Sequence, residues 1–210
     1  TYFCNWSVVQ SLPDSWAIGQ WFPILPTHRL DEYPACRGVL ADITCDSDGR
    51  VDRFIGAREA KRVLELHPYT GSDYYLAVCR VGAYQEILGD LHNLFGDTDT
   101  VHVEVDGSGE ERISDYVQGE AVGEVLAYVG FEEHWLMGRY DAALDRLVSE
   151  QVLPRSEAGE VREYLVRNLA CNPFLTAGSV KTARRDDLAE VEELGHEAGD
   201  TDVRAPQVHV

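Results

Sequence analysis

The spacing of the hydrophobic residues changes near residue 119, and this change limits the folds open to the chain. Residues 101–105 alternate apolar and polar side chains, as in a half-buried strand. Beyond residue 119, apolar residues recur at the three- and four-residue intervals of an amphipathic helix, as at Val122, Val125, Leu126 and Val129. The sequence therefore predicts a mainly β domain over residues 1–118 and a helical region over residues 119–175.

Short strand-like runs, separated by tight turns, fill the predicted β domain. They cover residues 2–9, 38–43, 51–55, 74–81, 101–105 and 111–116. The turn Asp106-Gly107-Ser108-Gly109 lies between the last two and predicts a hairpin. Two segments, residues 57–66 and 85–94, are predicted to be helical instead. Several short strands joined in this way predict a β-sandwich or barrel.

The two ends of the sequence differ in character from its middle. Residues 176–210 are polar and acidic, which predicts a disordered tail. Residue 1 is not methionine and the opening already has strand character, so we expect the natural chain to extend upstream. A trimmed but complete domain is the alternative. The opening lacks the features of a signal peptide, and no apolar run approaches the ~20 residues that a membrane helix needs.

Charge and cysteine content narrow the classes of partner. The 37 acidic and 18 basic residues give a formal net charge of -19, which argues against binding to nucleic acid or to an anionic membrane. Five cysteines without a Cys-x-x-Cys pair predict reduced thiols and a cytoplasmic location. No zinc site is expected, because His and Cys do not reach ligand spacing.

Two loops carry residue types that can do chemistry. Cys45 and Asp46 are adjacent in the first loop, and a thiol beside a carboxylate can move a proton. The second loop contains Gly82-Ala83-Tyr84, where a phenol beside a glycine can hold a phosphorylated cofactor. A buried structural cysteine, a turn-forming aspartate and a core tyrosine are the plain structural alternatives.

Longer motifs around these loops resemble those of the biosynthetic arginine decarboxylases. The motifs span residues 11–20, 26–32, 37–49 and 82–96, and the resemblance covers residues 1 to about 150. It implies an alanine-racemase-like enzyme (fold III), in which an α/β barrel binds pyridoxal 5'-phosphate and a mainly β domain follows. This chain would then be the β domain with C-terminal helices, without the barrel.

The resemblance also implies a role for each loop residue. Cys45 would return a proton to the substrate, and Asp46 would bind the distal cation of the substrate. Tyr84 would donate its hydroxyl to the cofactor phosphate, and Gly82 would let the backbone approach it closely. Magnesium is implied by the family alone, and no metal ligand is assigned in this chain. The lysine that links pyridoxal phosphate lies on the barrel in the family, and neither Lys61 nor Lys181 has a suitable context.

The implied activity is decarboxylation of L-arginine to agmatine and CO2 in polyamine (putrescine and spermidine) biosynthesis. The fragment alone would be inactive, because it needs the N-terminal barrel and, since the family's site is shared between subunits, a homodimer or tetramer. One alternative is decarboxylation of lysine, ornithine, diaminopimelate or carboxynorspermidine. Another is a non-catalytic regulatory homologue. His28 and His92 lie in the motifs and are expected to be structural.

Overall fold

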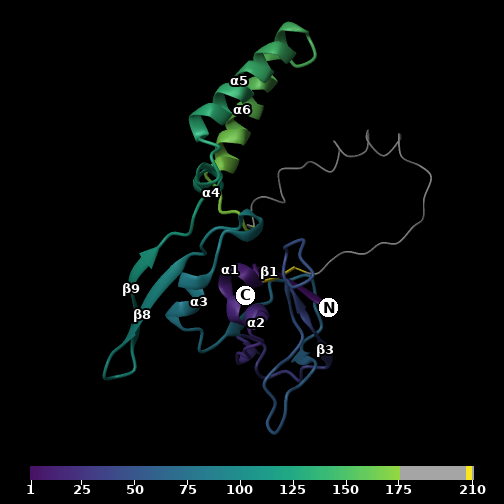
Figure 1. The fold of residues 1–210 in the computed structure, drawn as a ribbon, viewed down its shortest axis with the longest axis vertical. Coiled ribbons are helices and arrows are strands. Elements are labelled where there is room, and N and C mark those ends of the chain that lie inside the picture. The colour runs from purple at the N-terminus through teal and green to yellow at the C-terminus, as the bar shows by residue number, and fades with distance from the viewer. Residues whose placement is uncertain (176–206, 210) are drawn as a thin grey trace, which may run out of the picture. The chain divides into compact units, whose positions relative to one another are not determined.

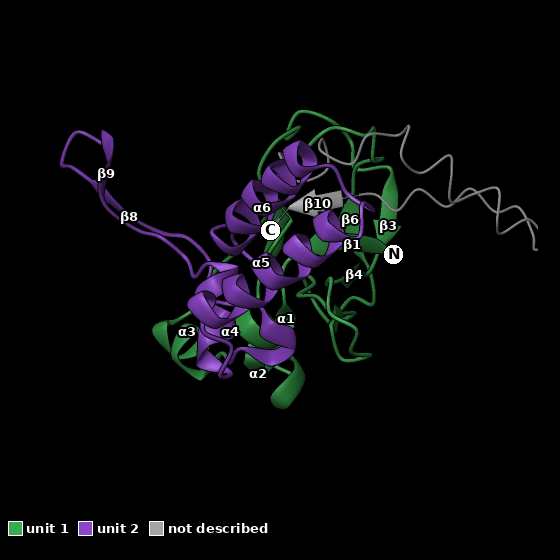
Figure 2. Ribbon diagram, turned by 90° about the horizontal axis from the view of Figure 1, so that it is seen from above, with its two compact units in different colours: residues 1–89, 174–210 green, residues 90–173 purple. Residues whose placement is uncertain are grey.

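Residues 1–175 and 207–209 are described in the computed structural model, and they belong to two units. One unit comprises Thr1–Gly89 with Phe174–Val210, and the other comprises Asp90–Pro173, as coloured in Figure 2. The predicted disordered tail, residues 176–210, lies outside the described residues except for positions 207–209.

Small sheets of short strands make up much of the first unit (Figure 1). The largest has the strand order β10-β1-β4-β5; β1 is parallel to both β10 and β4, and β4 is antiparallel to β5. The pairs β2–β7 and β3–β6 are antiparallel. The bounds are β1 Tyr2–Asn5, β2 Ile24–Pro26, β3 Cys36–Gly38, β4 Leu40–Ala41, β5 Arg50–Val51, β6 Leu64–Leu66, β7 Leu76–Val78 and β10 Gln207–His209.

Two short helices follow β1, and the first begins within residues 2–9, where the sequence predicted a single strand. They are α1, Val8–Ser11, and α2, Pro13–Ala17. The strand prediction is wrong beyond Asn5 because local capping overrides the apolar pattern. The side chain of Ser7 accepts a hydrogen bond from the backbone N–H of Gln10, which begins α1.

The prediction of a helix over residues 57–66 is also wrong, because the last three of these residues form strand β6, which pairs with β3. The helix predicted over residues 85–94 is confirmed in part. It is α3, Ala83–Leu88, followed by a short 3-10 helix, η1, at His92–Leu94.

One hydrophobic cluster holds the first unit together. Its fully buried members come from a helix, strands and a loop and include Val8, Leu40, Phe54 and Leu66. Burial of each such side chain contributes roughly 1.5–3 kcal/mol. The prediction of small β elements followed by helices is confirmed, but the described strands form separate small sheets rather than one sandwich or barrel. The described residues contain no α/β barrel, as expected.

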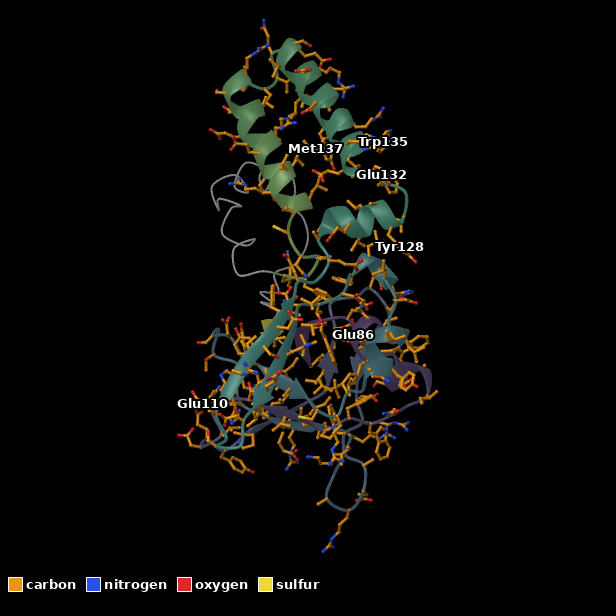
Figure 3. All side chains as sticks on the ribbon, turned by 90° about the vertical axis from the view of Figure 1, so that its left-hand side faces the viewer. Glu86, Glu110, Tyr128, Glu132, Trp135 and Met137 are labelled. Atoms are coloured by element: carbon orange, nitrogen blue, oxygen red, sulfur yellow. The ribbon has the colours of Figure 1, made fainter. Side chains whose placement is uncertain are left out.

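The second unit contains the hairpin that the sequence predicted, which follows η1. Strands β8, Thr100–Val105, and β9, Glu111–Val117, pair antiparallel, with an irregularity between His102 and Val103. The carboxylate of Asp106 closes the turn by accepting the N–H groups of Ser108 and Glu110. Glu110, labelled in Figure 3, lies at this end of the hairpin.

Three helices complete the second unit: α4 Val122–Tyr128, α5 Glu133–Ser149 and α6 Arg155–Leu169. Helices α5 and α6 pack against each other (Figure 1), and Arg162 forms an ion pair of 2.7 Å with Asp141 between them. Met137 is buried on α5, whereas Trp135, two residues earlier, is half exposed (Figure 3). Across the described ranges, no helix has both the length and the apolar character needed to cross a bilayer.

Candidate functional site

The Cys45–Asp46 turn connects β4 to β5 in the first unit. The backbone N–H of Asp42 donates to the carbonyl of Gly49 at 2.7 Å, and the N–H of Gly49 donates to the carbonyl of Asp46 at 3.1 Å. These bonds close a compact loop. Cys45 is exposed on it and Asp46 is partly buried, so the thiol is presented at the surface of this chain rather than packed in the core.

Beneath the turn lies a buried carboxylate, that of Asp42, whose side chain is 3% exposed. Its Oδ2 accepts the backbone N–H of Val8 at 2.8 Å. Its Oδ1 accepts the N–H of Thr44 at 2.9 Å and the hydroxyl of Thr44 at 2.7 Å. A second hydrogen bond joins the same two segments: the backbone N–H of Ile43 donates to the carbonyl of Trp6 at 3.2 Å. The turn is therefore fastened to the start of α1.

The Gly-Ala-Tyr motif begins helix α3. Gly82 is the residue before its first turn, and Tyr84 is 78% exposed on that turn. The neighbouring Gln85 is buried and hydrogen-bonds to Asp14 of α2. The helix thus turns one side chain inward as an anchor and leaves the Tyr84 phenol outward.

The far end of α3 lies close to α1. A Cβ atom added to Gly89, which ends α3, would lie 2.2 Å from the carbonyl oxygen of Gln10, so the two backbones are in direct contact. Figure 1 shows α1, α2 and α3 together. A four-residue helix is only ~6 Å long. The elements that carry Cys45 and Tyr84 are thus both attached to α1, one through Val8 and the other through Gln10.

The histidines of the motifs were expected to be structural, and for His28 the structure agrees. Its Nε2 accepts the backbone N–H of Tyr75 at 3.0 Å, and its ring lies against Tyr74. His92 lies in the 3-10 helix η1 of the second unit. No group of three or more acidic, His or Cys side chains in the described ranges could hold a metal ion.

The residues fit the phosphate end of pyridoxal phosphate better than its aldehyde end. The Tyr84 hydroxyl is an exposed donor, and a Cβ at Gly82 would meet nothing within 4 Å, which leaves room for a phosphate beside the backbone. The aldehyde needs an amine. Lys61 forms an ion pair with Glu65 and lowers the pKa of that carboxyl, and Lys181 is outside the described residues. The described part of the chain therefore offers groups suited to one end of this cofactor only.

The chain is similar to one portion of an amino-acid decarboxylase. Comparison with curated proteins makes this specific and confirms the resemblance to the biosynthetic arginine decarboxylases. The chain is 48% identical over 181 residues to the enzyme of Gloeobacter violaceus and 47% identical over 176 residues to that of Rhodopirellula baltica. It is 50% identical over 165 residues to that of Phocaeicola vulgatus.

These matches cover 84%, 83% and 78% of the chain but only 28%, 26% and 26% of the relatives, so the chain spans little more than a quarter of their length. A crystal structure of the biosynthetic arginine decarboxylase SpeA from Campylobacter jejuni matches with a TM-score of 0.69 and 30% identity. That match covers 82% of this chain and 28% of the SpeA chain. No protein-family model matches the chain.

Two residues of this region escaped the sequence analysis. Asp42 lies within a strand-like run, and an acid within an apolar run is a recognisable signal of a buried polar role. Gln85 lies in a predicted helix, and no local pattern distinguishes it from the other residues of that helix. Their partners, Val8 and Asp14, lie 34 and 71 positions away, which explains why neither contact could be foreseen.

Proposed function

We propose that this chain is the C-terminal part of a pyridoxal-phosphate-dependent arginine decarboxylase that converts L-arginine into agmatine and CO2 for polyamine synthesis. One observation carries the proposal: the two motifs that resemble this family present an exposed thiol and an exposed phenol from elements attached to the same helix, α1. The fold-III β domain of such an enzyme is the architecture that we assign to the first unit.

The tyrosine loop would hold the cofactor. When bound, pyridoxal phosphate would delocalise the negative charge left on the substrate after CO2 departs. The Tyr84 hydroxyl would donate a hydrogen bond to a phosphate oxygen, which is a stronger bond than one between neutral groups. Gly82 would admit the phosphate next to the backbone, because no side chain stands there.

The cysteine loop would act on the substrate. The Cys45 S–H bond would break as a new C–H bond forms at the substrate Cα, so that agmatine carries the proton. Asp46 would accept hydrogen bonds from the guanidinium of the substrate, because a carboxylate matches its two parallel N–H groups. The loop thus combines a proton donor and a substrate anchor in adjacent residues.

The active enzyme would need polypeptide beyond this chain. Lys61 is held by Glu65 in the described structure, so a barrel elsewhere in the protein would supply the amine that links the cofactor. A second subunit would complete the site, making the enzyme a cytoplasmic homodimer or tetramer. Magnesium would bind outside the described residues, which contain no suitable group of ligands.

The role of Cys45 is tested in the protein as its gene encodes it. We expect Cys45→Ala to retain the pyridoxal phosphate absorbance but to lower agmatine formation by 10²-fold or more, since general acid catalysis is worth about 10²–10⁴-fold. CO2 release should exceed agmatine formation, because the proton is then delivered to the wrong atom. Cys171→Ala, at another exposed thiol, is the control. Equal CO2 and agmatine at the normal rate would refute the role of Cys45.

The substrate is tested through Asp46. Asp46→Asn removes the negative charge, and we expect KM for arginine to rise about tenfold or more, in line with the loss of a charge-assisted hydrogen bond. Asp48→Asn, an exposed acid in the same turn, is the matched control and should leave KM unchanged. Assays with lysine, ornithine and diaminopimelate establish the preferred amino acid, and a higher kcat/KM for any of these would contradict the assignment to arginine.

A regulatory homologue is the second candidate, favoured by the ion-paired state of Lys61. Such a protein would lack pyridoxal phosphate absorbance and would alter the activity of a separate decarboxylase on mixing. Cofactor absorbance together with agmatine formation by the encoded protein alone would reject this candidate.

A further inference from the structure

We infer that Asp42 is a positioning residue, which fixes the Cys45–Asp46 turn in its working geometry from beneath. The inference rests on the proposed role of Cys45. It adds Asp42, whose burial is not explained by the roles proposed for Cys45 and Asp46. It is carried by burial, by three hydrogen bonds and by the contact of Asp42 with a glycine across the turn.

The burial of Asp42 needs an explanation. A carboxylate withdrawn from water is costly unless hydrogen bonds satisfy it. No ion pair among the described residues involves Asp42, and the three donors that it accepts from, on Val8 and Thr44, are all neutral. The sequence thus places a carboxyl group where a small apolar residue would merely fill space, and its two oxygens gather N–H and O–H groups.

These donors belong to the two segments that must be held together. One oxygen of Asp42 accepts from the first residue of α1 and the other from Thr44, the residue before Cys45. The Thr44 hydroxyl then accepts the N–H of Asp46 at 3.4 Å, so the chain of contacts reaches the residue after Cys45 as well. Both neighbours of the thiol are therefore tied to the same carboxylate.

On the other side of the turn, Gly49 lies directly against the Asp42 carboxyl and the Thr44 hydroxyl. A Cβ added to Gly49 would lie 2.1 Å from Oδ1 of Asp42 and 2.6 Å from Oγ1 of Thr44. Glycine is thus required by the closeness of the carboxylate and the hydroxyl, and not by backbone conformation. The turn closes directly upon Asp42, which leaves little freedom for the loop that carries Cys45.

The test uses Asp42→Asn in the protein as its gene encodes it. The amide keeps the shape but offers one acceptor oxygen to three donors, so the turn should loosen. We expect amide hydrogen exchange of residues 43–49 to rise about tenfold in the absence of substrate, while exchange in strand β6 is unchanged. The conservative Asp48→Asn, an exposed acid in the same turn, should change neither.

The catalytic readout separates positioning from general stability. Per cofactor-loaded molecule, Asp42→Asn should lower agmatine formation at least about tenfold and raise the ratio of CO2 to agmatine, because a misplaced donor loses rate steeply. In a Cys45→Ala background, with arginine saturating so that any loss of binding at Asp46 is masked, the same substitution should change agmatine formation less than about twofold, since Asp42 and Cys45 act as a unit. An equal fold loss in both backgrounds, with CO2 and agmatine still matched in the Asp42→Asn single variant, would overturn the inference.

A second variant guards against a failure of Asp42→Asn to fold. Thr44→Val removes the hydroxyl that donates to Asp42 and accepts from Asp46, and we expect loop exchange to rise at least about threefold, as the loss of two hydrogen bonds predicts. Unchanged exchange and an unchanged CO2-to-agmatine ratio in this variant would reject the positioning role. If Cys45→Ala itself leaves the ratio unchanged, the proposed function fails instead, and the exchange data alone decide whether Asp42 holds the turn.

Discussion

Gln85 and Asp14 form a two-point hydrogen-bonded pair that joins α3 to α2. The Gln85 Oε1 accepts the backbone N–H of Asp14 at 3.1 Å, and its Nε2 donates to the Asp14 carboxylate at 2.5 Å. Gln85 is buried, and its neighbour Tyr84 is exposed. The amide therefore fixes the orientation of the short helix that presents the phenol, much as Asp42 holds the turn that presents Cys45.

The first prediction follows from that pair. Gln85→Glu puts a carboxylate against the Asp14 carboxylate, and we expect a loss of about 1–3 kcal/mol in the free energy of unfolding at pH 7. Like charges favour protonation in the folded state, so the loss should shrink as the pH falls towards 4. Urea unfolding at both pH values measures it, with the exposed Gln20→Glu as control. A loss independent of pH would contradict charge repulsion.

Two glycines that flank the proposed chemistry should respond differently to alanine. Gly49→Ala would overlap Asp42, and we expect a destabilisation of about 1–3 kcal/mol, as for an overpacked site. Gly82→Ala should be neutral for stability, because its φ of -88° suits alanine and its surroundings are open. Thermal unfolding of the two variants provides the comparison. Equal melting temperatures would show that the turn can relax around a methyl group.

The phenol gives a prediction about the cofactor. In the protein as its gene encodes it, we expect Tyr84→Phe to weaken pyridoxal phosphate binding about tenfold or more, since a hydrogen bond to a charged group contributes roughly 1.5–3 kcal/mol. Titration followed by cofactor absorbance measures the Kd. Tyr128→Phe, at a similarly exposed tyrosine on α4, is the control. An unaltered Kd for Tyr84→Phe would exclude contact with the phosphate.

The sequence predicted an element correctly where its stabilising contacts join residues close together in the chain. It failed where those contacts join residues far apart in the chain. The β8–β9 hairpin was predicted correctly because alternation and turn residues specify it locally. Residues 57–66 were mistaken for a helix because Leu64–Leu66 form a strand only through pairing with Cys36–Gly38. The motif singled out Cys45 as a candidate proton donor. The hydrogen bond from Val8 to Asp42, which holds the turn that carries Cys45, is encoded by no local pattern.

The buried and exposed thiols should differ in reactivity. Burial, together with the negative charge of Asp42, raises the pKa of the Cys4 thiol from 9.0 to about 12. Because the thiolate is the reactive form, iodoacetamide at pH 8.5 should label Cys45 and leave Cys4 unmodified. Peptide mass spectrometry of the folded chain measures both sites, and labelling in denaturant confirms that Cys4 can react. Equal labelling under native conditions would show that β1 opens readily.

Ionisation of the same thiol should lower the free energy of unfolding at alkaline pH. The folded pKa of Cys4 lies above its unfolded value of 9.0, so the folded state binds more protons between about pH 9 and pH 12. The contribution of Cys4 is therefore fully present below pH 9 and is lost as the pH rises towards 12, at no more than about 1.4 kcal/mol per pH unit. Urea unfolding of the native chain and of Cys4→Ala at pH 8.0 and 9.5 should show a shallower decline in the variant. Cys171→Ala, at an exposed thiol, should decline like the native chain. Identical slopes for all three proteins would mean that the thiol ionises in the folded state as easily as in the unfolded chain.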